Sequence, residues 1–214
     1  KSPGTGNPSP DINCIASLGS YLFFGAYNGL YRSSDNGNSW QFCNNPHFTI
    51  DGVYTIAVKG NTLYLTYGSG YSQNYRSSDN GDSFEFIGEG ISYVYNFFSE
   101  GDNLYANTAD GIFHSQDDGT NWTRLALAGE TTYSTTFING NLIVGTRNLG
   151  IFTSTNYGVD WINTGYRNEL SPQAIVTLDN AILVGNDGQL GVLVSRDNGD
   201  TFTEYNNLSQ SFVK

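Results

Sequence analysis

Short runs of apolar residues alternate with polar, glycine-containing turns along most of this chain. The run "YLFFGA" (21–26) is followed by a turn and then by "GLYR" (29–32), and similar pairs recur towards the end of the sequence. The runs are rich in Tyr, Phe, Val and Ile and are bounded by Gly, Asn, Asp and Ser, which is typical of β-strands joined by turns. No window shows convincing helical periodicity. The pattern therefore predicts an all-β protein.

The pattern repeats five times. Each period holds four β-prone runs, and a near copy of one short sequence precedes the last of them. The closing aromatic residues of the copies are 44, 38, 39 and 41 residues apart. We call these copies the repeated motif; they are "SSDNGNSW" (33–40), "SSDNGDSF" (77–84), "SQDDGTNW" (115–122), "STNYGVDW" (154–161) and "SRDNGDTF" (195–202).

A four-stranded period of about 40 residues matches one blade of a β-propeller. We predict a single five-bladed β-propeller with four antiparallel strands per blade over residues 11–206. Residues 1–10 are expected to be a linker or tail, and residues 207–214 a tail that is either a closure strand or the start of a further blade. WD40 repeats have a similar length, but their Trp-Asp and Gly-His signatures are missing. A stacked β-solenoid is the structural alternative, although its coils are usually shorter.

The repeated motif has a physical reading as a turn between the third and fourth strands. Its acid can accept hydrogen bonds from backbone N–H groups just ahead, its glycine supplies an unusual backbone conformation, and its aromatic ring packs beneath the turn. Asn156 replaces the acid in the fourth copy, so we expect a hydrogen-bond acceptor at this position and not a catalyst. Calcium would need more carboxylates than the motif offers, and no metal site is predicted. The structural residues so predicted are Asp35, Gly37, Trp40, Asp79, Gly81, Phe84, Asp117, Gly119, Trp122, Asn156, Gly158, Trp161, Asp197, Gly199 and Phe202.

The motif Ser-x-Asp-x-Gly-x-Ser/Thr-Trp/Phe resembles the Asp-box, or BNR repeat, of sialidases, sortilin-type receptors, some xyloglucan-degrading enzymes and many exported bacterial proteins. The resemblance covers residues 11–206, and five copies in phase with four-stranded periods make it specific for the fold. It implies a propeller of the sialidase-like superfamily, nearest to the non-catalytic exported repeat proteins. In such propellers, ligands use the face opposite the motif or the central channel.

Composition narrows the range of partners. The formal net charge is −11 and the few basic residues are scattered, so neither nucleic acid nor an anionic membrane surface is an expected partner. No apolar run approaches the length of a membrane-spanning helix. No cofactor is predicted either, because no phosphate-binding loop, Ser-His-Asp set or cysteine–histidine metal spacing is present.

The composition also suggests a secreted or surface-displayed bacterial protein. Gly, Asn, Ser, Thr and Tyr are abundant, and the chain has no methionine and begins "KSPGTGNPSP", so we expect a processed chain whose targeting segment has been removed. Cys14 and Cys43 are expected to be unpaired thiols, with a disulfide as the alternative in an oxidising compartment.

Two segments are longer than their counterparts in the other repeats. They are the second-to-third-strand loop of the second period (67–75) and the link between the first two periods (43–52), and both should emerge side by side opposite the motif. Aromatic rings beside amides and a carboxylate suit stacking on sugars or gripping a peptide. The alternative is a loop that folds on its own aromatics, in which His47 is a packing residue. The candidate ligand-binding residues are Tyr67, Tyr71, Asn74, Tyr75, Asn45, His47, Phe48 and Asp51.

The sequence lacks the arginine signature of a sialidase. Sialidases grip the substrate carboxylate with three arginines, whereas Arg32 and Arg76 lead directly into the repeated motif and only Arg147 and Arg167 fall in loops of the candidate face. Sialidase propellers also have six blades. A glycosidase needs two suitably spaced carboxylates. The acids on the candidate face are Asp51, Glu89, Asp110, Glu130, Glu169 and Asp187, and no pair of them stands out.

Three function classes remain, and no catalytic residue is assigned. The first is a non-catalytic secreted or surface module that binds glycan or protein ligands. The second is a glycoside hydrolase or lyase. The third is a purely structural propeller within a larger surface protein.

Overall fold

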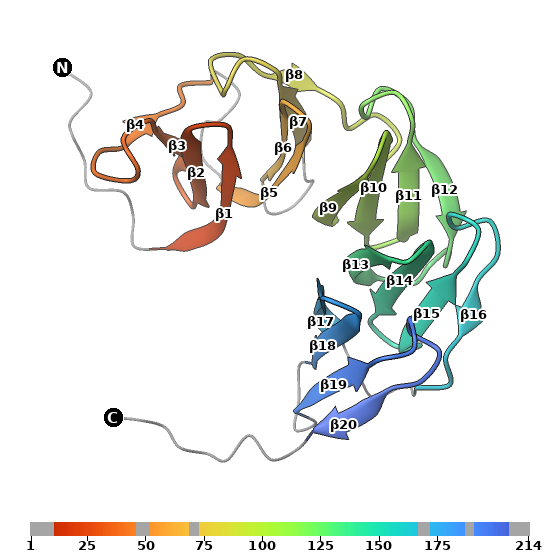
Figure 1. Ribbon diagram of the computed structural model, residues 1–214. Coiled ribbons are helices and arrows are strands. Elements are labelled where there is room, and N and C mark those ends of the chain that lie inside the picture. Colours follow the sequence, from red (N-terminus) through yellow and green to blue (C-terminus); the bar gives the residue numbers. More distant parts are fainter. Residues whose placement is uncertain (1–10, 46–51, 69–72, 167–171, 187–190, 206–214) are drawn as a thin grey trace. The chain divides into compact units, whose positions relative to one another are not determined.

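The computed structural model describes residues 11–45, 52–68, 73–166, 172–186 and 191–205 (Figure 1). Among them lie twenty β-strands and no helix that could cross a membrane. The strands are β1 (Ile12–Leu18), β2 (Tyr21–Ala26), β3 (Gly29–Ser33), β4 (Gln41–Phe42), β5 (Val53–Lys59), β6 (Thr62–Tyr67), β7 (Gln73–Ser77), β8 (Glu85–Phe86), β9 (Val94–Glu100), β10 (Asn103–Thr108), β11 (Gly111–Ser115), β12 (Thr123–Ala126), β13 (Thr132–Ile138), β14 (Asn141–Thr146), β15 (Ile151–Ser154), β16 (Ile162–Asn163), β17 (Pro172–Leu178), β18 (Ala181–Asn186), β19 (Val192–Ser195) and β20 (Thr203–Tyr205).

Consecutive groups of four strands form five separate sheets, which we number 1 to 5 in chain order. Within each sheet, each strand pairs with its neighbours in the sequence, and the strand pairings of sheets 1, 2, 4 and 5 are antiparallel. Five four-stranded antiparallel sheets match the blades of the predicted five-bladed β-propeller. The predicted tails at residues 1–10 and 207–214 lie outside the described residues.

Burial explains why the second strand of each period is rich in apolar residues. This strand lies between the first and third strands of its sheet, and β6, β10 and β14 are buried along all but their first residue. A strand covered on both faces has no solvent side to carry polar residues. The fourth strands contain two to four residues and form the exposed edges.

Contacts divide the chain into two compact units, to both of which sheet 3 contributes. In the first unit β1 lies beside β5, and β5 beside β9. Its core includes Phe23, Leu30, Val53, Leu63 and Leu65. In the second unit β13 lies beside β17, around Ile143, Ile151, Ile182, Val184 and Leu193.

The strand register defines two ends of each sheet. At one end, Leu18 pairs with Tyr21, and Leu22 pairs with Ser33, which opens the repeated motif. We call this the motif end. At the other end lie the start of the first strand and the turn between the second and third strands, because Ile12 pairs with Ala26 and Ala26 with Gly29. We call this the opposite end, and the links between sheets also meet here.

The repeated motif closes its own turn through hydrogen bonds. In the third copy, the Asp117 carboxylate accepts the Asn121 backbone N–H at 2.8 Å and the Ser115 hydroxyl at 2.8 Å. The equivalent acceptors Asp35, Asp79, Asn156 and Asp197 take the backbone N–H four residues ahead at 2.8–2.9 Å. This is the acceptor role that the sequence suggests for the third motif position. It is met with an amide in the fourth copy, so the contact does not need a charge.

The first serine of the motif has a structural role that the sequence did not reveal. In the second copy, the buried Ser77 hydroxyl accepts the Gly81 backbone N–H at 2.9 Å and donates to Asp79 at 2.8 Å. The bond from the motif glycine to the serine recurs in all five copies. The serine is thus the buried centre of the turn, and the acid or amide at the third position lies nearer the surface. The five serines are Ser33, Ser77, Ser115, Ser154 and Ser195.

The motifs of sheets 2 to 5 each pack against the preceding part of the chain. The Trp122 indole N–H donates to the Ile87 carbonyl of sheet 2 at 3.0 Å. A Cβ atom on Gly119 would lie 2.9 Å from the Ile87 side chain, so a glycine is needed there. The equivalent Gly158 faces Leu125 of sheet 3. The motif therefore both closes a turn and fills the layer between neighbouring sheets.

The two cysteines are free thiols, in agreement with the preferred reading of the sequence. Cys14 lies beside Gly25 and Cys43 beside Gly81. Burial raises the pKa of each thiol to about 12. Both cysteines therefore behave as small apolar residues and not as nucleophiles.

Candidate functional site

The two lengthened segments meet at the opposite end of sheets 1 and 2, as far as they are described. The Gly68 backbone N–H donates to the Gly52 carbonyl at 3.0 Å, and Val53 pairs with Tyr67. The flanks of both segments are therefore side by side. The candidate residues His47, Phe48, Asp51 and Tyr71 lie outside the described residues.

The other four candidate residues are buried. The exposed fraction is 6% for Asn45, 5% for Tyr67, 0% for Asn74 and 4% for Tyr75. The Asn74 side chain accepts the Thr66 hydroxyl at 2.9 Å inside the sheet. Rings and amides without open surface cannot offer a stacking face to a ligand, so these four residues have a packing role in this structure.

The reason is that the strands extend further than the sequence suggested. β6 runs to Tyr67 and β7 begins at Gln73, with Tyr67 paired to Gln73 and Thr66 to Asn74. The Tyr75 ring packs edge-on against Phe86 of the fourth strand. Of the nine residues expected to form a loop, Tyr67 and residues 73–75 belong to the paired strands.

Exposed aromatic residues do gather at the opposite end, on other segments. Tyr27 lies in the turn between β2 and β3, Tyr54 is the second residue of β5, and Tyr93 and Tyr95 flank the start of β9. Their exposed fractions are 56%, 37%, 40% and 46%. We call these four residues the tyrosine face; all belong to the first unit.

Local backbone geometry presents these rings to solvent. The pairing of β5 with β6 shifts register between Val53 and Thr55, so Tyr54 is the extra residue of a β-bulge, and a bulge re-aims the side chain that it carries. Gly52 packs against the turn at Tyr27, where an added Cβ atom would lie 2.6 Å from the Tyr27 Cα. This close approach brings the Tyr27 turn next to the entrance of β5.

Tyr93 adopts a left-handed backbone conformation with φ of 52°. A bulky residue in this region is a steric outlier that costs on the order of 1–3 kcal/mol. Non-glycine residues with positive φ also occupy the fourth position of every motif copy, where the turn requires it. Tyr93 is outside any motif, so its strain is a local feature of the link into β9.

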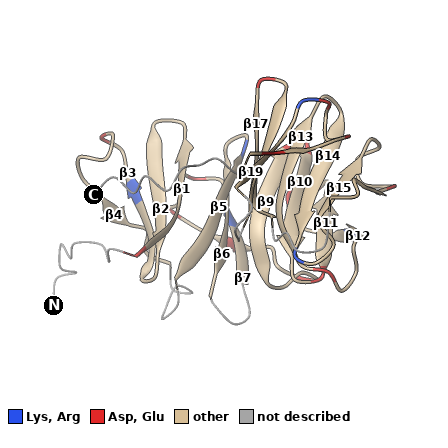
Figure 2. Ribbon diagram, turned by 90° about the horizontal axis from the view of Figure 1, so that it is seen from below, with Lys and Arg blue, Asp and Glu red and all other residues tan. Residues whose placement is uncertain are grey.

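The described cations of the first unit all lie at the motif end of its sheets. Arg32 binds the Asn80 carbonyl and Asp82, Arg76 binds the Asp118 carbonyl, and Lys59 contacts Asp118, all at the motif end. These are the cations of the described part of the first unit, and in Figure 2 the lysines and arginines of the described residues are few and scattered. No described cation of this unit therefore lies at the tyrosine face.

Acidic residues do lie at the opposite end. Asp11 precedes β1 and Glu89 lies in the link from β8 to β9, and both are exposed. In the second unit, Glu130 accepts the Asn148 backbone N–H at 2.6 Å, and Asp110 accepts Arg124 at 2.6 Å and the Gly129 N–H at 2.7 Å. The last two acids thus hold loops together. The other candidates, Asp51, Glu169, Asp187 and Arg167, lie outside the described residues, and Arg147 is exposed.

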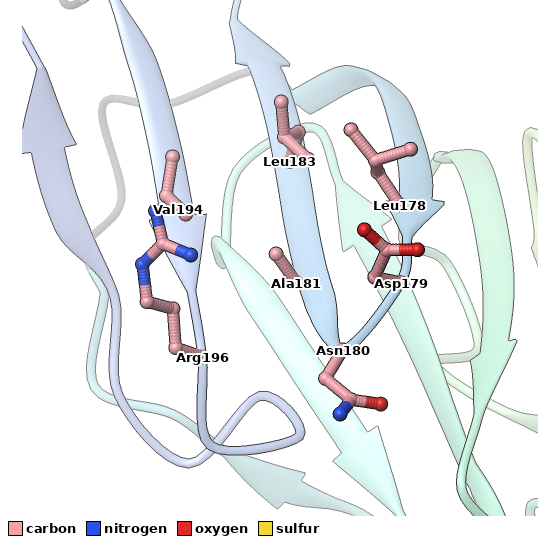
Figure 3. A pocket seen from close by; sticks show the side chains of 7 residues that line it. All are labelled: Leu178, Asp179, Asn180, Ala181, Leu183, Val194 and Arg196. Atoms are coloured by element: carbon pink, nitrogen blue, oxygen red, sulfur yellow. The ribbon is translucent and has the colours of Figure 1, made fainter.

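A hollow of about 380 Å³ lies on sheet 5 (Figure 3). Its wall includes Leu183, which occupies the strand position of Phe23 in β2 and Ile143 in β14. Those two side chains each lie 3.3 Å from a Cβ placed on the motif glycine of the following sheet. In other sheets, the equivalent face packs against the motif of the following sheet. The hollow therefore gives no reason to assign a small-molecule ligand to sheet 5.

A second hollow of about 490 Å³ lies beside Trp40 and Leu22 of sheet 1. Trp40 is the closing aromatic of the first motif, and in sheet 3 the equivalent Trp122 packs towards the preceding sheet. This hollow thus lies beside a motif tryptophan, on the kind of face that packs against a preceding sheet, and it too gives no reason to assign a small-molecule ligand.

Sequence reasoning missed the tyrosine face because it looked for insertions. A signal was available in the repeat itself. Tyr54, Tyr95 and Tyr133 each stand second in the first strand of their period. Packing of a half-buried strand does not require an aromatic residue at this position, so its recurrence is a signal.

Comparisons with known proteins bear on the fold alone. No protein-family model matches the chain, and no curated protein matches it. Many solved structures do match, all of those given below at less than 25% sequence identity.

Three of the similar structures are propeller proteins of different kinds. The extracellular domain of the two-component system BT4673 from B. thetaiotaomicron is 17% identical, with a TM-score of 0.74, over 90% of this chain and 27% of that one. The GH74 xyloglucanase from Xanthomonas campestris is 15% identical, with a TM-score of 0.69, over 91% and 37%. YCF48, solved bound to D1 peptide, is 16% identical, with a TM-score of 0.67, over 90% and 66%. This chain thus has the fold of these proteins and spans only part of the length of each.

Proposed function

We propose that this chain is a non-catalytic, extracellular binding module that holds a glycan or protein ligand on the tyrosine face. The main support is that four exposed tyrosines lie at the opposite end of sheets 1 to 3, away from the repeated motif. We further infer that the motif is an Asp-box repeat, because its serine, acid and glycine form the same closed turn five times.

The two ends of the sheets divide structure from recognition. At the motif end, the acids and the cations of the first unit are engaged in turns and ion pairs. At the opposite end, tyrosines offer flat apolar rings with a polar hydroxyl, which suit both sugar rings and peptide segments. A ligand at the tyrosine face would leave the motif contacts intact.

The catalytic alternative has less support. Arg32 and Arg76 are held at the motif end, and Asp110 and Glu130 are occupied by loop contacts. Likeness to a GH74 xyloglucanase at 15% identity concerns the fold only. No described pair of carboxylates is therefore assigned a catalytic role.

An extracellular location is supported by composition and by the neighbours. The chain is rich in Gly, Asn, Ser, Thr and Tyr, and one similar structure is an extracellular domain from a bacterium. Each of the three similar chains is longer than this one. We infer that the module belongs to a secreted or cell-surface protein, within a larger assembly of domains.

The test is binding by the native chain and a variant that lacks two rings, Tyr54→Ala with Tyr95→Ala. Both are applied to arrays of neutral glycans, acidic glycans and peptides, with thermal melting as a check on folding. We expect saturable binding by the native chain. The affinity should fall at least tenfold in the double variant with its Tm unchanged, because stacked rings contribute most of the contact. Tyr157→Ala, which removes an exposed ring from the fourth motif, is the matched control. Binding that survives in the double variant would refute the tyrosine face as the site.

A further inference from the structure

We propose that the ligand of the tyrosine face is a basic segment of a partner protein, one that presents lysine or arginine side chains. This inference rests on the proposed function and names the ligand class of the same site. It is carried by the juxtaposition of exposed tyrosines with acidic side chains at an end of the sheets where the first unit has no described cation.

The first unit has no described cation at the tyrosine face, which favours a cationic ligand there. Arg32, Lys59 and Arg76 are all held at the motif end, as described above. Glu89 is exposed in the link into β9 and makes no ion pair with the described residues. The whole chain carries a formal charge of −11, which attracts a basic partner and repels an acidic one.

Aromatic side chains make this end more than a negative surface. The face of a tyrosine ring attracts an ammonium or guanidinium group through its quadrupole. Glu89 and Tyr93 lie four residues apart in the link from β8 to β9, and Tyr95 is the second residue of β9. Tyr54 stands at the position of Tyr95 in the neighbouring strand β5. Rings and a carboxylate supplied by this link and by the start of β9 can contact the stem and the charged head of one basic side chain together.

The strained backbone supports a binding role for this link. Tyr93 is held at a positive φ outside any motif, as are Leu127, Asn139 and Asp179, and strained residues are enriched at ligand-binding sites. The Ile91 backbone N–H donates to the Gly88 carbonyl at 3.3 Å, which closes a turn around Glu89. The link thus holds Glu89 in a closed turn and leads through Tyr93 into β9, where Tyr95 is the second residue.

The experiment measures binding of a synthetic peptide by the complete chain. The probe is a soluble peptide in which Lys and Arg alternate with Gly and Ser, and the comparison peptide has Gln in place of every basic residue. A neutral oligosaccharide and an acidic one are titrated in parallel. The variants are Tyr95→Ala, Tyr54→Ala and Glu89→Gln. The controls are Tyr157→Ala and Glu100→Gln, because Glu100 lies at the far end of the same strand β9.

We expect the basic peptide to bind, the Gln peptide to bind at least tenfold more weakly, and the affinity to fall as salt is added. Tyr95→Ala and Glu89→Gln should each weaken binding about tenfold with Tm unchanged, and the two controls should not. If all variants still bound the basic peptide, binding would depend only on the overall charge of the chain, and the inference would be overturned. Binding of the neutral oligosaccharide alone, lost on Tyr54→Ala, would overturn the inference and leave the proposed function standing. Failure of every probe would count against both.

Discussion

The buried serine that opens each motif should contribute more to stability than the acid-rich sequence around it suggests. The second copy offers a matched pair, since Ser77 is buried and its neighbour Ser78 is exposed. We expect Ser77→Ala to destabilise the fold and Ser78→Ala to be nearly neutral. The two changes remove the same atom from adjacent positions, so the comparison isolates the buried hydrogen bonds.

The magnitude follows from the bonds that are lost. Without the Ser77 hydroxyl, the buried Gly81 N–H loses its acceptor at 2.9 Å, and an unsatisfied buried donor costs about 1–3 kcal/mol. Asp79 loses one donor but keeps the N–H groups of Asp82 and Ser83, so this second loss is smaller. The sum is about 2–3 kcal/mol, which corresponds to a fall in Tm of roughly 5–10 °C for a chain of this size.

The assay is urea unfolding at constant pH, followed by tryptophan fluorescence and by circular dichroism to check that the two probes agree. Ser78→Ala should lie within about 0.5 kcal/mol of the native chain. If Ser77→Ala and Ser78→Ala had the same free energy of unfolding within that margin, the buried serine would not be the centre of the turn.

Three further predictions concern the acids, a glycine and catalysis. Hydrogen bonds from Ser39 and Ser33 lower the pKa of Asp35 to about 2, below its ordinary value of 3.8. The folded state therefore binds fewer protons than the unfolded state. The contribution of Asp35 to stability is present above pH 3.8 and is lost as the pH falls towards 2. Asp35→Asn should flatten that acid limb in unfolding measured across the same range, and an unchanged limb would contradict the assignment. Gly158→Ala should destabilise the fold by about 1–2 kcal/mol more than Gly129→Ala. Both glycines have positive φ, but only at Gly158 would the new methyl group lie 2.5 Å from Leu125. Equal unfolding curves for the two variants would refute this packing argument. No fluorogenic sialoside should be hydrolysed, and turnover that disappears on Arg147→Ala would reverse the non-catalytic assignment.

The repeat and its turns could be read from the sequence because their causes are local. The motif joins its serine, acid and glycine by hydrogen bonds that span at most four residues, so any chain with these residues in order can form the turn. The four apolar runs per period likewise specify four strands, and a short hairpin connection leaves few alternatives to pairing each strand with the next. Fold class, five sheets and the place of the motif between third and fourth strands follow from these facts.

The candidate site depended on pairings that the sequence does not display. Whether Tyr67 and Tyr75 face solvent or the interior depends on how far β6 and β7 remain paired, and a residue pattern of aromatic and polar side chains fits a loop and a hairpin end equally well. Tyr54 is the extra residue of a bulge in the pairing of β5 with β6, and Gly52 closely approaches the turn at Tyr27. Register and close approach arise between segments distant along the chain, so only the tertiary structure decides which tyrosines are buried and which remain open to a ligand.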